Sequence, residues 1–326
     1  MRLNLRELRK RIENEADAYV LLEELRWPHG PVCPHCGHDK AYFLKPANGT
    51  SRATGPKRTQ SQRRVWKCAK CRKQFSVLTG TIFHGTKVPI ETWLMVMVQM
   101  SSAKNGISAR EIERMHGLTP ETAWFVLHRL REAMKRDPLA GRLSGTIVAD
   151  ETWIGGNPAN KHFNKRVRDE WGNRITCTDK TPVVSLVHKE TGEVRSQAVA
   201  RVNAANLRDV LKQHVDAPNS VLHTDGAQVY RRFQADLVGH QPVDHVAGEY
   251  VRGDVSTNQA ENYFSQLKRS IDGTHHHVSK EHLPRYLAEF DFRYSTCKLS
   301  DSERLQRMVD QTQGRRLTYE PLRDSE

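Results

Sequence analysis

Three acidic residues, far apart in the chain, have the chemistry and the local surroundings of a divalent-cation site. Asp150 ends the segment GTIVAD, Asp225 ends the segment SVLHTD, and Glu261 lies within TNQAENYFSQLKRS. Carboxylate oxygens are ligands that suit Mg²⁺ or Mn²⁺, and two such ions can activate the attacking oxygen and stabilise the leaving oxygen of a phosphodiester displacement. A single aspartate at a strand end is more often a cap or turn residue, so only the set of three is informative.

A basic pair follows Glu261 in the same segment. Seven residues turn an α-helix by about 700°, so Lys268 points within roughly 20° of Glu261, about 10 Å along the axis. Lys268 and Arg269 could therefore hold a phosphate group beside the carboxylate. The alternative is an ordinary amphipathic helix with a charge pair seven residues apart.

A second set of possible metal ligands lies in the first quarter of the chain. Four of the six cysteines form two CxxC pairs separated by 31 residues: Cys33, Cys36, Cys68 and Cys71. Zn²⁺ takes four tetrahedral ligands, so this spacing predicts a zinc ribbon. His35 and His38 could substitute as ligands, and the alternative is a redox pair or unrelated free thiols.

Basic residues concentrate around the second cysteine pair. Between Pro46 and Lys73 there are nine Lys or Arg residues and no acid. Charge runs usually form solvated faces, but on a zinc ribbon they favour a surface that contacts DNA phosphates. The predicted DNA-binding residues are Arg63, Arg64, Lys67, Lys70, Arg72 and Lys73, together with Lys268 and Arg269.

The elements that must position the three acids alternate between strand and helix patterns. Strand patterns end at Asp150 and Asp225, a hairpin surrounds residues 190–192, and helical spacing covers residues 203–215 and 256–271. The order strand, hairpin, helix, strand, helix predicts a mixed α/β domain, in which the ends of two strands can lie side by side.

Helical patterns dominate the segments that precede this domain. Residues 6–26 predict one amphipathic helix, and residues 89–136 predict several more. Ser108 and Thr119 are helix caps on either side of a turn at Gly117, which is the arrangement of a helix-turn-helix whose second helix could enter the major groove. Any helical hairpin can imitate this pattern.

The overall charge favours a polyanionic partner. The chain has 326 residues and a formal net charge of +13. Nucleic acid is the expected partner, because no apolar run approaches the roughly 18 residues that a membrane span needs. The N-terminus has no secretory signal pattern, so we expect a cytoplasmic protein that does not contact membranes.

Taken in order, these motifs resemble bacterial insertion-sequence transposases of the ISXO-like group, which have an N-terminal zinc ribbon and a DDE domain. The resemblance covers about residues 30–296 and depends on CPHCG, CAKCRKQFSVLTGTIF, ADETWIGG, HTDGAQVY and NQAENYFSQLKRSIDGTHHHVSKEHLPRYLAEFDFRYS. It implies an RNase H-like fold with Asp150 on the first strand, Asp225 after the fourth and Glu261 on the following helix. Some relatives have Asn as the third residue, and Glu151 is interpreted as a supporting residue.

The resemblance also implies an activity. A DNA transposase would bind double-stranded terminal repeats, cleave with Mg²⁺ or Mn²⁺, join the 3′-OH to target DNA, and work as a homodimer or larger synaptic assembly with structural Zn²⁺. The alternatives are a zinc-ribbon DNA-binding regulator with an inert RNase H-like scaffold and a hydrolytic DNA nuclease. The expected boundaries are an N-terminal helix at 1–29, the zinc ribbon at 30–85, the helix-turn-helix at 86–138, the catalytic domain at 139–297 and a charged tail at 298–326.

Overall fold

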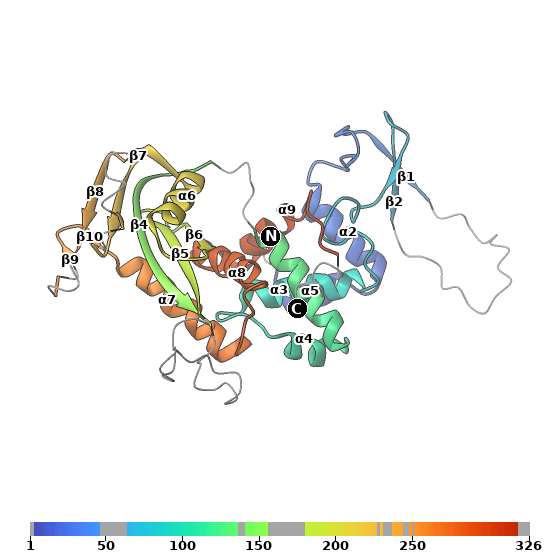
Figure 1. The fold of residues 1–326 in the computed structure, drawn as a ribbon. Coiled ribbons are helices and arrows are strands. Elements are labelled where there is room, and N and C mark those ends of the chain that lie inside the picture. Colours follow the sequence, from blue (N-terminus) through green and yellow to red (C-terminus); the bar gives the residue numbers. More distant parts are fainter. Residues whose placement is uncertain are drawn as a thin grey trace. The chain divides into compact units, whose positions relative to one another are not determined.

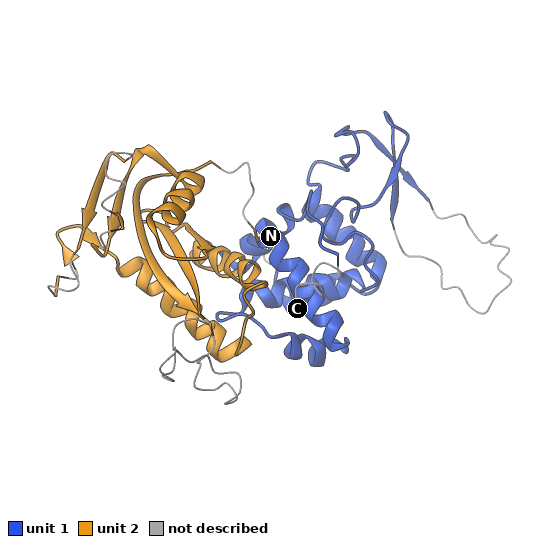
Figure 2. Cartoon of the chain, viewed as in Figure 1, with its two compact units in different colours: residues 1–134, 299–324 blue, residues 135–298, 325–326 orange. Residues whose placement is uncertain are grey.

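The chain forms two compact units (Figure 2). The computed structural model describes residues 3–45, 64–135, 141–155, 180–226, 229–230, 237–243, 248–249 and 251–318. Unit 1 combines residues 1–134 with residues 299–324, and unit 2 comprises residues 135–298 and 325–326. Among the described residues, no helix has both the length and the apolar character needed to cross a bilayer.

A small antiparallel sheet in unit 1 carries the cysteines. Its strands are β1 (Ala41–Leu44), β2 (Val65–Cys68) and β3 (Gln74–Phe75), in the order β1-β2-β3. Phe43 pairs across the sheet with Trp66, and their rings meet edge to face with centroids 5.3 Å apart. Cys33 and Cys68 are buried beside Phe75, so the short sheet obtains its core from aromatic rings and sulfur atoms.

The N-terminal helical segment is divided into two helices rather than the single helix expected for residues 6–26. They are α1 (Leu5–Arg11) and α2 (Glu15–Arg26). Asn14 causes the division, because its side chain accepts hydrogen bonds from the first turn of α2 while Asp17 bonds back to the Asn14 amide. This capping box starts a new helix at a point where the apolar periodicity alone predicts continuity.

Three further helices in unit 1 include the predicted helix-turn-helix: α3 (Ile90–Ser102), α4 (Ala109–His116) and α5 (Pro120–Met134). Ser108 forms a capping box with Glu111, and Gly117 ends α4 in the left-handed conformation at φ 63°. Thr119 accepts a hydrogen bond from the Thr122 amide, as a cap of α5 should. The second half of α5 is buried, so only its first turns are available to a partner.

The C-terminal segment, expected to be a charged tail, instead completes unit 1. Helix α9 (Asp301–Asp310) contacts α2, α3 and α5. Its residues Leu305, Met308 and Val309 are fully buried. These three residues have the i, i+3, i+4 spacing of a helix face, so the segment contributes one apolar face to the core of unit 1.

Unit 2 is built on a five-stranded mixed sheet (Figure 1). Its strands are β4 (Leu143–Ile154), β5 (Thr181–His188), β6 (Val194–Ala198), β7 (Val215–Thr224) and β8 (Gly239–Pro242), in the order β6-β5-β4-β7-β8. The strand β5 is antiparallel to both neighbours, whereas β4, β7 and β8 are parallel. In chain order this is 3-2-1-4-5 with only the second strand reversed, which is the RNase H-like arrangement that the resemblance implied.

Helices cover both faces of this sheet (Figure 1). Alternation along β4 separates the faces: Val148 and Ile154 pack with α7 (Asn258–Ser270) and α8 (Leu283–Ser295), whereas Ile147 and Ala149 pack with α6 (Ala204–His214). Helix α7 is preceded by a two-stranded ribbon of β9 (Val251–Arg252) and β10 (Val255–Ser256). A short π-helical turn (Ile271–His275) follows α7 and extends it.

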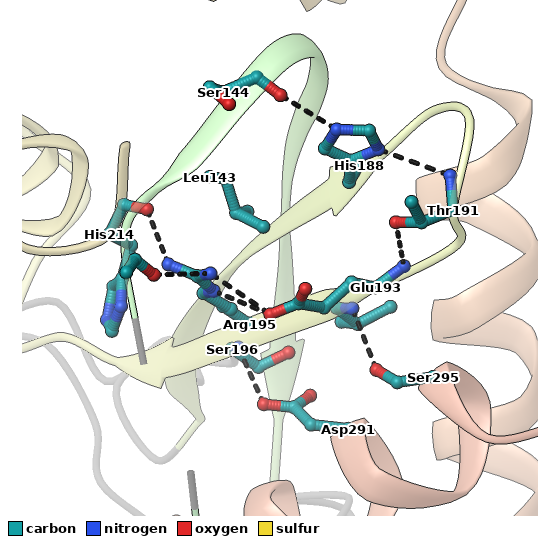
Figure 3. Close-up of polar contacts among 12 residues, drawn as sticks. Leu143, Ser144, His188, Thr191, Glu193, Arg195, Ser196, His214, Asp291 and Ser295 are labelled. Atoms are coloured by element: carbon teal, nitrogen blue, oxygen red, sulfur yellow. Dashed lines mark hydrogen bonds and ion pairs between the residues drawn. The ribbon is translucent and has the colours of Figure 1, made fainter. Parts of the chain in front are cut away.

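Buried polar groups fasten the β5–β6 hairpin to the rest of unit 2 (Figure 3). Arg195 donates to the carbonyl oxygens of His214 at the end of α6 (2.6 Å) and of Gly141 before β4 (3.0 Å). On the opposite side of the hairpin, the Ser196 amide donates to Asp291 on α8 at 2.8 Å. Because each contact joins a different element, the hairpin fixes the relative positions of the helices and the central strand.

Candidate active site

Asp150 and Asp225 lie next to each other at the centre of the sheet. The parallel pairing of β4 and β7 includes Val148 opposite His223, two residues before each aspartate. Continuing that register places Asp150 opposite Asp225, with both side chains directed to the same face. The strand β7 ends at Thr224, whereas β4 continues to Ile154 alongside β5, so the two carboxylates lie where one strand stops and its neighbour continues.

Gly226 makes the turn that directs the chain away after Asp225. Its φ is +83°, and a Cβ atom built there would lie 3.0 Å from the carbonyl oxygen of Val243. Its amide donates to the Thr224 hydroxyl at 3.3 Å. A residue with a side chain would be strained in this conformation and crowded by the backbone of the neighbouring segment.

A third carboxylate joins the two aspartates. Asp150, Glu151 and Asp225 each have an oxygen within 4.8 Å of the others, and all three residues are half-buried. Two unit charges at 4.8 Å repel by about 3 kcal/mol at an effective dielectric constant of 20. The fold therefore gathers negative charge that a divalent cation would neutralise, and the all-oxygen donor set fits Mg²⁺ or Mn²⁺.

Glu151 differs from the two aspartates in its surroundings. Its pKa is raised to about 7, mainly by burial and also by the charges of Asp225 and Asp150, against a hydrogen bond from the Tyr230 hydroxyl that lowers it. Sequence reasoning gave Glu151 only a supporting role and did not select Tyr230. The sequence offered one sign for both residues, namely that each lies close in sequence to a predicted ligand. Glu151 follows Asp150 directly, and Tyr230 is five residues after Asp225.

The four cysteines converge in unit 1. Their sulfur atoms lie within 4.8 Å of one another, with Cys33 to Cys71 and Cys36 to Cys68 both at 3.6 Å. Zn–S bonds of about 2.3 Å at tetrahedral angles place sulfurs roughly 3.8 Å apart, so the four thiols have the spacing that Zn²⁺ requires.

The two CxxC turns have the same backbone design. The Gly37 amide donates to the Cys33 carbonyl at 2.9 Å, and the Arg72 amide donates to the Cys68 carbonyl at 3.2 Å. Gly37 and Arg72 both have positive φ, at 71° and 61°. Each turn thus curves around the cluster in the same way, although only the first uses glycine.

Two family models match the parts of the chain that contain the carboxylates and the cysteines. An ISXO2-like transposase domain matches residues 142–295, and a transposase zinc-ribbon domain matches residues 13–74. The protein carries the two domains of an ISXO2-like transposase. The first match spans the sheet with Asp150 and Asp225, and the second includes β1, β2 and all four cysteines, so the resemblance drawn from the sequence motifs is confirmed.

Relatives of the transposase include a protein from a mobile element. A protein in transposable element ISH50 of Halobacterium salinarum is 25% identical over 308 residues, which cover 92% of this chain and 98% of the relative. Among solved structures, the simian T-cell lymphotropic virus intasome in complex with PP2A regulatory subunit B56 gamma matches at 12% identity and a TM-score of 0.28. That match covers 60% of this chain and 65% of the intasome chain.

Glu261 of the transposase lies on the predicted helix but outside the group of three carboxylates. It is exposed in the first turn of α7, and its carboxylate accepts a hydrogen bond from the Thr257 hydroxyl at 3.1 Å. Its neighbour Ala260 packs against the same sheet face as Val148, and strand alternation directs Asp150 to that face. Among the described residues, the structure thus brings together Asp150 and Asp225, and it places Glu261 on the adjacent helix.

The predicted DNA-binding residues other than Arg64 fall into three groups. Lys70, Arg72, Lys73, Lys268 and Arg269 are exposed, Lys67 is half-buried on β2, and Arg63 lies outside the described residues. Arg269 donates to Ser265 at 3.0 Å, one turn earlier on α7.

Arg64 is engaged in contacts within the protein rather than being exposed for a DNA phosphate. It donates to the Glu23 carboxylate at 2.8 Å, and its guanidinium lies 4.6 Å from the centre of the Phe43 ring. Glu23 also accepts from the Trp66 indole at 2.8 Å. Arg64 thus fastens the ribbon to α2. A DNA phosphate could bind Arg64 only by replacing its ion pair with Glu23. The run of basic residues in the sequence gave no sign of this ion pair.

Proposed function

We propose that this transposase binds the ends of its own insertion sequence, cleaves a strand at each end and joins the freed 3′-OH to target DNA. The observation that carries the proposal is the convergence of Asp150, Glu151 and Asp225 at the centre of an ISXO2-like domain. Negative charge gathered on neighbouring strands has a clear use in a phosphodiester displacement, where a cation must approach the DNA backbone.

Asp150 and Asp225 would hold the divalent cation, with Glu261 as the third ligand expected from the family. Bound Mg²⁺ or Mn²⁺ supplies activation of the attacking oxygen and stabilisation of the leaving oxygen. The chain contributes the arrangement: β4 and β7 fix the two aspartates, and Gly226 turns the backbone so that the Asp225 side chain remains at the strand end.

Basic side chains would hold the DNA. Lys268 and Arg269 are exposed on the same helix as Glu261, so they can contact phosphates close to the reacting group. Lys70, Arg72 and Lys73 on the ribbon would add sequence-independent affinity for the double-stranded ends, and the first turns of α5 would read the major groove. Two ends must react together, so we propose a homodimer or a larger synaptic assembly.

A strand-transfer assay tests this proposal. Labelled element ends and target DNA are incubated with the zinc-loaded protein and Mg²⁺ or Mn²⁺, and we expect joined products that disappear with EDTA. Asp225→Asn should abolish cleavage and joining while leaving end binding nearly intact, because it removes a charged ligand but no DNA contact. Asp209→Asn, an exposed residue of α6, is the matched control and should retain full activity.

The outcomes separate the alternatives. Cleavage without joining would support the hydrolytic nuclease, and end binding without any cleavage would support the DNA-binding regulator. Strand transfer that persists in Asp225→Asn would contradict the assignment of the cation site.

A further inference from the structure

Among the described residues of unit 2, two buried tyrosines each donate a hydrogen bond to a half-buried carboxylate. Tyr230 and Tyr263 are each 1% exposed. The Tyr230 hydroxyl donates to Glu151 Oε1, and the Tyr263 hydroxyl donates to Asp291 Oδ1 at 2.7 Å. The pairs belong to different core clusters, on opposite faces of the sheet.

The two carboxylates differ in what meets their second oxygen. Asp291 Oδ2 accepts the Ser196 amide at 2.8 Å, so both oxygens of Asp291 serve the fold. Within the described part of the chain, no donor contacts Glu151 Oε2. Glu151 instead has an oxygen within 4.8 Å of oxygens of both Asp150 and Asp225. A half-buried carboxylate held this close to two like charges is explained if a cation lies among them.

The chemistry of the partner of Glu151 supports the same conclusion. A lysine or arginine beside Glu151 would cancel its charge and weaken its attraction for a metal ion. A tyrosine hydroxyl is neutral, so it orients the carboxylate without adding a positive charge that would repel a metal ion. Hydrogen-bonded partners of this kind commonly fix the orientation of metal ligands.

The chain path makes Tyr230 a rigid partner. Its ring is packed in the core cluster that contains Ile147, Ala149 and Leu222 from β4 and β7. Those two strands also carry or lead into Asp150 and Asp225, so the Tyr230 hydroxyl is fixed relative to the same backbone that positions the aspartates. Glu151 therefore has one orienting contact that cannot move independently of the site.

We propose that Glu151 is a ligand of the divalent cation held by Asp150 and Asp225, and that Tyr230 is the positioning residue that orients it. This inference rests on the cation site of the proposed function. It gives this transposase a carboxylate ligand adjacent to the first aspartate, in addition to the acid on α7.

Direct Mn²⁺ binding tests the inference without reference to activity. The full-length, zinc-loaded protein is titrated with Mn²⁺, and free Mn²⁺ is measured by electron paramagnetic resonance. We expect Tyr230→Phe to weaken Mn²⁺ binding about 10-fold, the lower end for loss of a contact that orients a metal ligand. Glu151→Gln should weaken it more, and Glu151→Asp, which keeps the charge on a shorter side chain, should bind between Glu151→Gln and wild type.

The second tyrosine pair supplies matched controls. Tyr263→Phe and Asp291→Asn remove the same groups from a similarly buried pair outside the acid group. Their Kd for Mn²⁺ should therefore equal that of wild type, because neither residue orients a ligand of the cation. Loss of binding in these controls as large as in Tyr230→Phe would overturn the positioning role.

Asp225→Asn distinguishes the two levels of the proposal. If this variant binds Mn²⁺ as wild type does, the cation site and the proposed function both fail. If Asp225→Asn loses binding while Glu151→Gln and Tyr230→Phe retain the wild-type Kd, the proposed function stands and the inference about Glu151 is overturned. If Glu151→Gln loses Mn²⁺ binding while Tyr230→Phe keeps the wild-type Kd, Glu151 remains a ligand and only the positioning role of Tyr230 is overturned.

Discussion

Arg72 occupies a backbone conformation that glycine adopts more readily. Its φ of 61° matches that of Gly37 at the equivalent position of the first CxxC turn, where no side chain is present. A residue with a Cβ atom in this region costs about 1–2 kcal/mol, partly offset by the lower chain entropy of its unfolded state. Arg72 is exposed, as are Lys70 and Lys73. The phosphate contact proposed above for its guanidinium would be a reason to tolerate that cost.

We predict that Arg72→Gly stabilises the zinc-loaded protein by about 0.5–1 kcal/mol and weakens DNA binding. The slope of log K against log salt should fall by about 1, because one phosphate contact is lost. Thermal unfolding and fluorescence anisotropy with element-end DNA measure the two effects. Arg72→Ala is the control: it should lose the same DNA affinity without the gain in stability, and an Arg72→Gly variant that binds DNA as wild type does would contradict the proposed contact.

Asp291 gives unit 2 a pH-dependent stability. Burial raises its pKa from 3.8 to about 6, against hydrogen bonds from Tyr263 and Ser196 that lower it. Because the folded-state pKa lies above the unfolded value, this stabilisation is complete below about pH 4 and is lost as the pH rises through about 6.

Asp291→Asn should remove this dependence, which is on the order of 2–3 kcal/mol between the two limits. The asparagine carbonyl can accept the Ser196 amide, and its amide can donate to the Tyr263 oxygen. We expect the Tm of the variant relative to wild type to increase between about pH 4 and pH 7, in a series of thermal melts without metal. A Tm difference that is the same at every pH would show that Asp291 does not titrate in this range.

At the level of single elements, local patterns predicted much of unit 2. The hairpin at residues 190–192, the helix after Asn203 and the helix that carries Glu261 all form where the sequence placed them. Each depends on interactions within about ten residues, such as the Asn203 side chain that caps α6. Local periodicity is therefore sufficient for these elements.

The relation between Glu151 and Tyr230 could not be obtained in the same way. The two residues are 79 positions apart, and their contact depends on the parallel pairing of β4 with β7. The capping box at Asn14 that divides α1 from α2 is local, by contrast, and was readable from the sequence Asn-x-x-Asp. Apolar periodicity continues across that point, which explains the expectation of one helix.

The turn after β7 is predicted to be sensitive to a single methyl group. Gly226→Ala should cost about 2–4 kcal/mol, because the new Cβ would be strained at φ +83° and would contact the Val243 carbonyl oxygen at 3.0 Å. Gly192→Ala, at φ +75° with nothing within 4 Å, carries the strain without the contact and should cost about half as much. Thermal unfolding compares the two variants, and an equal loss in both would show that the close approach to Val243 has no effect.

At the scale of the whole molecule, the chain leaves unit 1 and returns to it. Unit 2 is inserted between Met134 and Leu299, and α9 then adds Leu305, Met308 and Val309 to the core of unit 1. The sequence contained the i, i+3, i+4 signal for this helix, but the surrounding charges favoured the interpretation as a tail. What the sequence could not show is which distant unit the apolar face would join.

A truncation after Lys298 should therefore unfold unit 1 and abolish DNA binding. Three fully buried apolar side chains contribute on the order of 5 kcal/mol, which approaches the whole stability of a domain. Limited proteolysis should show that the segment before residue 135 becomes sensitive while unit 2 remains protected. A chain truncated after Thr318 keeps all the described residues and should bind DNA normally. Full DNA binding by the chain truncated after Lys298 would refute the role of α9.

In the proposed site, Asp150, Glu151 and Asp225 surround a divalent cation. Anomalous diffraction from crystals of the zinc-loaded protein soaked in Mn²⁺ measures this directly. We predict an anomalous difference peak among these three carboxylates, absent in crystals of Asp225→Asn. A map without a peak there, at a Mn²⁺ concentration that supports strand transfer in solution, would contradict the account.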